Sequence, residues 1–164
     1  MSKDFVITRE FKAPRKLVFQ VWSDPKHLLN WMGPKGSKYE YVKADLRAGG
    51  TVHYKTYGPG NVPMYGMAEY KEISPIEKII YVQYFSDEKG NPVRHPMSAT
   101  WPLKMNTTVI FKDKGANTEI TLTWTPINPN EIEAKTFSDA IPGMTQGWGG
   151  SFEVLDQYLA EVSK

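Results

Sequence analysis

The C-terminal run from Asn130 to Lys164 reads NEIEAKTFSDAIPGMTQGWGGSFEVLDQYLAEVSK. Its apolar residues recur at spacings of three and four, the pattern of an apolar stripe along one face of a helix. The stripe comprises Phe137, Ile141, Met144, Trp148, Phe152, Leu155, Leu159 and Val162. An interior proline removes a backbone donor and clashes with the preceding turn, so Pro142 and Gly143 should break or kink the helix near its start. We therefore predict a long C-terminal helix that buries one face.

Three glycines, Gly147, Gly149 and Gly150, interrupt this stripe. Each costs a helix roughly 1 kcal/mol relative to alanine, so the cluster requires a compensation. A helix face without side chains can approach a sheet very closely, or it can leave space beside it. An ordinary kink between two packing helices is the alternative interpretation.

The remainder of the chain predicts one strand, two short helices and six further strands. Residues 4–12 alternate as a strand, Pro14 suits the first turn of a helix that reaches Trp22, and the sequence from Ser23 to Pro25 starts a second helix. Six runs between turn residues predict antiparallel, mostly hairpin-connected strands: Tyr39–Leu46, Thr51–Tyr57, Met64–Ile73, Glu77–Phe85, Ser98–Lys112 and Asn117–Thr125. This order predicts an α+β fold in which a curved antiparallel sheet packs against the final helix.

Alternation along the strands predicts which side chains face that helix. Ile120, Leu122 and Trp124 share one side of the last strand, while threonines occupy the other. The run from Met64 to Ile73 is ambiguous, because Gly66 permits a bulge that would change the side on which later residues lie. The face that Glu69 occupies therefore stays open.

Aromatic side chains make up 13% of the chain, and large flat residues line cores and pockets alike. We expect a small-molecule cavity between sheet and helix, lined by Trp31, Tyr54, Tyr81, Gln83, Phe85, Trp101, Phe137, Met144 and Trp148. Gln83 and the phenols of Tyr54 and Tyr81 would orient a ligand there. The alternative is that the same residues simply fill the core.

Composition argues against several other classes of protein. The net charge of +2 supplies no basic stripe for nucleic acid, and no apolar run approaches the length of a membrane span. His27, His53 and His95 lack the spacings of zinc hydrolases, and the chain has no cysteine, so we assign no metal, cofactor or catalytic residue. Glu69 could act as a general base only if it lay beside the cavity. The loop from Ser86 to Met97 could form a lid over the cavity mouth.

Five segments carry a family resemblance: Phe11–Pro25, Trp31–Gly36, Asp45–Gly50, Glu72–Pro75 and Gly143–Trp148. They resemble the family related to the C-terminal domain of the heat-shock-protein-90 ATPase activator, within the START-like or SRPBCC superfamily. The length of 164 residues suits one domain over residues 1–164. The resemblance implies that this domain has a helix-grip fold, a seven-stranded sheet wrapped around the long helix and an elongated apolar cavity. Met32 and Ile76 depart from the pattern, because many relatives have tryptophan and proline there.

Three functions follow as hypotheses. The residues favour binding of a small hydrophobic or aromatic molecule without catalysis. The resemblance adds stimulation of a chaperone ATPase, although the eukaryotic activators use an additional N-terminal domain for it, and cyclase or hydrolase chemistry in the same cavity. We expect a cytoplasmic protein that binds no nucleic acid and does not insert into membranes, with its oligomeric state open.

Overall fold

The computed structural model describes residues 3–32, 38–57 and 59–163. Within these ranges, the strands are β1 (Phe5–Phe11), β2 (Tyr39–Ala44), β3 (Thr51–Tyr57), β4 (Pro63–Ser74), β5 (Lys78–Ser86), β6 (Met105–Lys114) and β7 (Asn117–Pro126). The helices are α1 (Arg15–Ser23), α2 (Pro25–Leu28), the 3-10 turn η1 (Pro59–Asn61), α3 (Glu131–Asp139) and α4 (Ile141–Val162). The predicted sheet of seven strands and the long C-terminal helix are confirmed.

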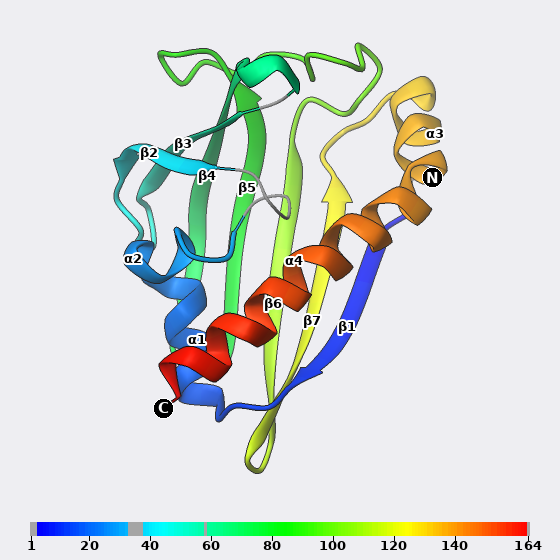
Figure 1. The fold of residues 1–164 in the computed structure, drawn as a ribbon. Helices are drawn as coiled ribbons and strands as arrows, with labels where there is room; N and C mark the ends of the chain where they lie inside the picture. The colour runs from blue at the N-terminus through cyan, green and yellow to red at the C-terminus, as the bar shows by residue number, and fades with distance from the viewer. Residues whose placement is uncertain (1–2, 33–37, 58, 164) are drawn as a thin grey trace.

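The sheet is antiparallel throughout, in the order β1-β7-β6-β5-β4-β3-β2. Strands β1 and β2 are its two edges, so the connection through α1 and α2 spans the full width of the sheet. The long helix α4 lies diagonally across one face, with α1 and α2 beside its C-terminal end (Figure 1). We call the face toward α4 the inner face and the opposite one the outer face.

The core lies between the inner face and the second half of α4. Phe152 and Leu155 of α4 are fully buried, and the Phe152 ring meets Phe11 of β1 edge-on at 5.2 Å between centroids. Trp22 of α1 is also buried and packs against Phe111 of β6 at 6.1 Å. These contacts tie the helices to both the edge and the centre of the sheet.

The C-terminal helix is interrupted where Pro142 predicts it. Helix α3 ends at Asp139 and α4 starts at Ile141, so Pro142 falls in the first turn of a new helix, where its missing N–H costs nothing. Helix α3 starts with a capping box, in which Asn130 and Glu133 each accept a hydrogen bond from the other's backbone N–H, at 2.8 and 3.0 Å. The predicted break is confirmed.

Two details of the predicted strands are wrong. Strand β6 begins at Met105 instead of Ser98, because Pro102 cannot donate to a ladder and Trp101 N donates to Ser98 O in a turn at 3.1 Å. The bulge of β4 lies between Tyr70 and Glu72, and the pairing around Gly66 is regular. A one-residue shift at that point puts residues after the bulge on the opposite parity, which explains the ambiguity of the sequence pattern.

Over the described ranges, no helix combines the length and the apolar character that crossing a membrane would require.

Candidate ligand-binding cavity

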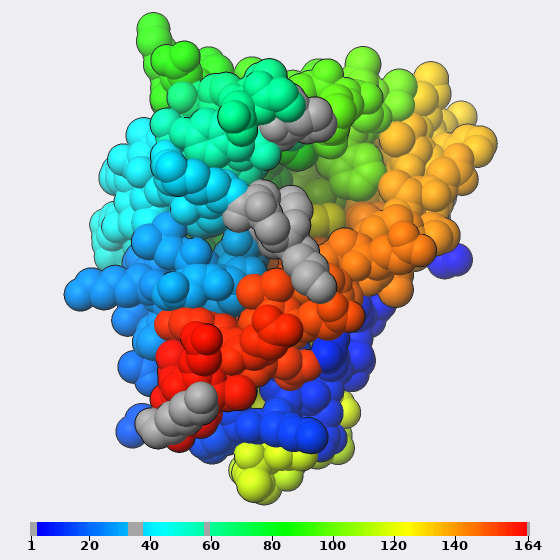
Figure 2. Space-filling view, viewed as in Figure 1, coloured from blue at the N-terminus to red at the C-terminus, as the bar shows by residue number. Residues whose placement is uncertain are grey.

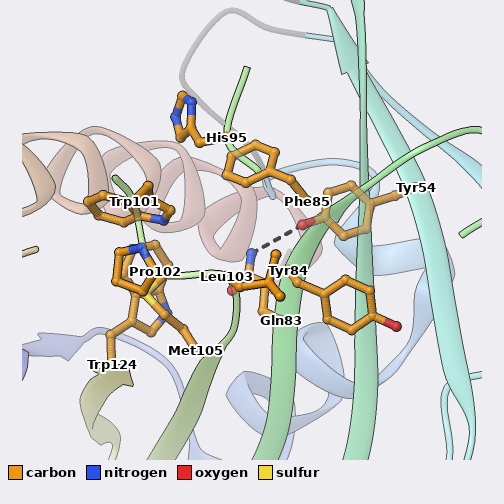
Figure 3. A pocket seen from close by; sticks show the side chains of 10 residues that line it. All are labelled: Tyr54, Gln83, Tyr84, Phe85, His95, Trp101, Pro102, Leu103, Met105 and Trp124. Carbon is orange, nitrogen blue, oxygen red and sulfur yellow. Dashed lines mark hydrogen bonds between the residues drawn. The ribbon is translucent and has the colours of Figure 1, made fainter. Parts of the chain in front are cut away.

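A cavity of about 220 Å³ opens at the end of the sheet where β5 meets the loop of residues 87–104. It is lined by Tyr54, Gln83, Tyr84, Phe85, His95, Trp101, Pro102, Leu103, Met105 and Trp124. The surface is hollowed between this loop and the first turns of α4 (Figure 2). Figure 3 shows the loop residues and Trp124 standing opposite Tyr54 and Phe85. The lining is mostly aromatic and aliphatic, as is usual for small-molecule sites.

One glycine positions the polar corner of this cavity. Gly66 of β4 pairs with Tyr54 on one side and with Phe85 on the other. A Cβ at this position would lie 2.4 Å from Cζ of Tyr54, so only glycine lets that ring lie across β4. The Tyr54 hydroxyl thereby reaches Gln83, whose Nε2 donates to it at 3.1 Å (Figure 3).

The Tyr54 hydroxyl is a neutral group. Burial raises the pKa of this phenol above its ordinary value, more than the hydrogen bond from Gln83 lowers it. The ring is also stacked on Tyr39 at 5.0 Å between centroids. Tyr54 is thus a fixed, protonated hydroxyl at the cavity wall.

Two polar atoms of the cavity lining are buried without a hydrogen-bond partner in the described part of the chain. One is the acceptor Oε1 of Gln83, and the other is the donor Nε1 of Trp124. More than nine in ten buried polar groups in proteins are paired, so these two atoms are exceptions that need a reason.

The loop of residues 87–104 forms one wall of the cavity through His95. Its imidazole lies against Phe85, at 4.5 Å between ring centroids, and near Trp101, at 6.2 Å. Nδ1 accepts a hydrogen bond from the backbone N–H of Met97 at 2.9 Å, which places the proton of the neutral ring on Nε2. Burial lowers the pKa of His95 below its ordinary value of 6.5.

Two side-chain links hold the same loop to α3. Arg94 forms an ion pair with Glu133, and it also donates to the carbonyl of Trp101 at 3.1 Å. Thr136 donates to the hydroxyl of Thr100 at 2.9 Å. The loop predicted as a lid is therefore fastened to a helix in this structure, with Trp101 between the two links.

Four of the nine residues predicted from the sequence line the cavity: Tyr54, Gln83, Phe85 and Trp101. The other five pack elsewhere in the interior. Trp31 is buried and donates from Nε1 to the carbonyl of Val21 at 3.0 Å, and Tyr81 packs against Tyr70 at 5.1 Å.

The remaining three predicted residues lie behind the side chains that line the cavity. Phe137 is fully buried behind Trp101, with 5.5 Å between ring centroids. Trp148 meets Trp124 edge-on at 5.7 Å, and Met144 is half-buried one turn before it on α4. Ligand contact by these residues stays a prediction.

The glycines of α4 leave space and do not bring the helix close to the sheet. A Cβ added at Gly147 or Gly149 would meet no atom within 4 Å. The buried residues of α4 start only at Ser151, at the middle of the helix. Of the two compensations expected from the sequence, close approach is therefore wrong for these two glycines.

Several lining residues were not among those predicted. Met105 and Trp124 have the inward parity of their strands and could have been included on that signal. His95, Pro102 and Leu103 belong to a loop, where no periodicity indicates a direction. Tyr84 lines the cavity as well, although its hydroxyl points to the outer face.

Glu69 lies on the outer face, away from the cavity. It accepts a hydrogen bond from Tyr84 at 2.8 Å and one from Lys71 at 3.4 Å. Burial alone would raise its pKa, but these two bonds and the positive charges of Lys71 and Lys104 together outweigh burial, and the pKa lies below the ordinary value. An ionised carboxylate on this face cannot act as a base on a molecule in the cavity.

His53 also belongs to the outer face, as its parity predicts, and it is buried there. Its Nε2 lies 3.2 Å from Oγ of Ser86 and 3.3 Å from the carbonyl of Asp87. Across the described ranges, no group of three histidine or carboxylate side chains is arranged to hold a metal ion.

Three solved structures resemble the chain over nearly its whole length. Protein Ms6760 from Mycobacterium smegmatis is 25% identical, with a TM-score of 0.76, and the match covers 94% of this chain and 88% of that one. A protein from Arthrobacter aurescens is 26% identical, with a TM-score of 0.79 and coverage of 96% and 86%. The AHSA1 protein from Silicibacter pomeroyi shares the fold at 18% identity, with a TM-score of 0.70 and coverage of 96% and 98%. No curated protein matches the chain.

A curved antiparallel sheet of seven strands packed on a long C-terminal helix defines a helix-grip protein of the START-like (SRPBCC) class. The chain belongs to the family of Activator of Hsp90 ATPase homolog 1-like proteins, whose model matches residues 12–160. The family resemblance read from the sequence is thereby confirmed.

Proposed function

We propose that this protein binds a small, largely apolar molecule of one or two rings in the cavity beside Tyr54 and Trp101. The observation that carries the proposal is the cavity of about 220 Å³ with its mostly apolar lining. A cavity of about 150 Å³ lined by aliphatic and aromatic side chains suffices to hold benzene. Sites for drug-sized ligands are larger, about 300–1,000 Å³, so the expected ligand is smaller than those.

The space around the glycines of α4 supports the same proposal. Gly147 and Gly149, which are unfavourable in a helix, are not required by a close contact, because a Cβ at either position would meet no atom within 4 Å. A helix whose first half is built for packing would carry alanine or leucine at such positions.

Native mass spectrometry on freshly purified protein, followed by organic extraction, is the first test of this proposal. A small apolar passenger at one molecule per chain is the expected result. Calorimetric titration with toluene, naphthalene and 2-naphthol then tests the cavity directly. A folded protein that carries no passenger and binds none of the three compounds would contradict the proposal.

A matched pair of variants locates the binding. Trp101→Ala removes a ring that lines the cavity, and we expect about tenfold weaker binding, equivalent to about 1.4 kcal/mol. Val6→Ala changes an exposed side chain on β1, which is 56% accessible to solvent, and should leave binding unchanged. Equal losses in both variants would show that binding is not in this cavity.

The family and the fold also suggest a role that resembles activation of the Hsp90 ATPase. The specific observation behind this second candidate is the match to the family model over residues 12–160. Addition of the purified protein to Hsp90 and measurement of ATP hydrolysis tests it. A rise in hydrolysis would support this role, and an unchanged rate would contradict it.

A further inference from the structure

Gln83 and Trp124, two side chains of the mostly apolar cavity lining, each carry one buried polar atom without a partner in the described residues. Oε1 of Gln83 and Nε1 of Trp124 are both fully buried, and neither has a partner in the described part of the chain. Both side chains line the same cavity (Figure 3). Buried polar atoms are rarely left without a partner, because no water replaces the hydrogen bond that they lose on folding.

The local structure prevents Gln83 from satisfying itself. Its Nε2 donates to the Tyr54 hydroxyl at 3.1 Å, and this bond orients the amide so that Oε1 is the free end. Tyr54 is in turn fixed by Gly66 below it and by Tyr39 stacked on its ring. Tyr54, Gly66 and Tyr39 therefore fix the position of Gln83 Oε1, but none of them donates a hydrogen bond to it.

Trp124 is held equally firmly. Its ring lies 5.9 Å from Phe5 of β1 and 5.7 Å from Trp148 of α4, between centroids. An indole between two rings cannot swing to find a carbonyl for its N–H. Both orphaned atoms thus belong to rigid side chains, as expected of groups that are organised in advance for a ligand.

Charge complementarity narrows the class of ligand further. None of the ten described lining residues is an aspartate, glutamate, lysine or arginine. The one titratable base among them is His95, and its Nδ1 is already used by the backbone N–H of Met97. A charged ligand would lose its hydration without gaining a counter-charge, so the cavity selects neutral molecules.

We propose that the cavity takes a neutral aromatic molecule that donates a hydrogen bond to Gln83 Oε1 and accepts one from Trp124 Nε1, such as a phenol or a heteroaromatic amide. This inference rests on the proposed function and specifies its ligand. Hydrocarbons and plain alkyl chains fit the volume but leave both polar atoms unpaired. A site with buried polar groups discriminates strongly against analogues that lack the matching groups.

Three probes of similar shape separate the contributions. 2-Naphthol donates and accepts, 2-methoxynaphthalene only accepts, and naphthalene does neither. We expect 2-naphthol to bind at least tenfold more tightly than naphthalene, although naphthalene is the more hydrophobic compound. 2-Methoxynaphthalene should lie between the two.

Two variants connect this preference to the two atoms. Gln83→Met keeps a side chain of similar length without the amide and should reduce the preference for 2-naphthol over 2-methoxynaphthalene to within about twofold. Trp124→Phe should reduce the preference for 2-methoxynaphthalene over naphthalene in the same way. Nuclear magnetic resonance of the indole N–H groups gives an independent readout, because 2-naphthol should shift the Trp124 signal. The signal of Trp22 is the internal control, because its Nε1 is also buried without a hydrogen-bond partner among the described residues but the side chain does not line the cavity.

The outcomes separate this inference from the proposed function. Equal or tighter binding of naphthalene would overturn the inference and leave the cavity as an apolar site. A 2-naphthol preference that persists in both variants, with the spectra of folded proteins, would also overturn it. If no probe binds, the proposed function itself fails and the inference fails with it.

Discussion

Gly66→Ala should destabilise this protein by about 2 kcal/mol, although alanine is normally the better residue in regular structure. The added Cβ would lie 2.4 Å from Cζ and 2.5 Å from Oη of Tyr54. Non-bonded carbon atoms pack at about 3.5–4.0 Å, so the ring must move by roughly 1 Å or more. It cannot move freely, because it is stacked on Tyr39 and bonded to Gln83.

The magnitude combines three effects. Overpacking of this kind costs about 1–3 kcal/mol, and loss of the bond between Gln83 and Tyr54 costs about 1 kcal/mol. Replacing glycine reduces the entropy of the unfolded chain, which returns about 0.4–1 kcal/mol. The net loss of about 2 kcal/mol corresponds to a fall in Tm of about 4–8 °C for a chain of this size.

Urea denaturation of the unaltered protein and four variants tests this reasoning. Gly149→Ala is the matched control, because its Cβ would meet no atom within 4 Å, and we expect it to be neutral or stabilising by up to about 1 kcal/mol. Tyr54→Ala removes the ring, so in the double variant Gly66→Ala should no longer be destabilising. Gly66→Ala as stable as the unaltered protein, or a double-mutant cycle without coupling, would refute the assigned role of Gly66.

Three further predictions concern the loop and the tryptophans. The pKa of His95 is lowered in the folded protein, which therefore favours the neutral ring. The free energy of unfolding loses nothing from His95 above its ordinary pKa of 6.5 and decreases as the pH falls below that value. His95→Asn should flatten this part of the curve of unfolding free energy against pH. Trp22→Ala removes a buried indole and should lower the free energy of unfolding, measured by denaturation, by about 3–5 kcal/mol. Trp148→Ala should mainly weaken ligand binding, because Trp124 loses a supporting ring. Unchanged binding by a folded Trp148→Ala protein would contradict this. Glu133→Ala loses both the capping box and the ion pair and should lower the free energy of unfolding by about 1–2 kcal/mol. Arg94→Ala should lower it by less, because the Arg94 side chain is half-exposed. Thermal unfolding of both variants ranks them, and the reverse order would contradict the capping role.

The fold was predictable because its periodicities are strong. A strand with one buried face alternates with period 2, and a helix packed on that face repeats at three and four, so both patterns are visible in the sequence. Pro142 also marked the break before α4. The start of β6 was misplaced because Trp101 and Met105 share a parity, and parity does not show where a loop becomes a strand.

The site was predictable only where it is built from strands. Parity identified Tyr54, Gln83 and Phe85 as inward-facing, and they line the cavity. Parity gives the face of a sheet but not the position along it, so it does not distinguish Tyr81, which packs against Tyr70, from the inward-facing residues that line the cavity. The role of Gly66 depends on strand register, which brings Tyr54 over it and which no local pattern encodes.

The tryptophans form a nearly continuous chain through the interior. Trp31 lies 4.6 Å from Trp22, Trp22 lies 6.2 Å from Trp148, and Trp148 lies 5.7 Å from Trp124, all between ring centroids. Trp101, the fifth tryptophan of the sequence, lines the cavity together with Trp124. Excitation energy transfers readily between indoles at such separations. A quencher bound at the cavity would therefore reduce the fluorescence of all the tryptophans in this row. Intrinsic tryptophan fluorescence therefore offers a label-free test of the proposed binding at this cavity.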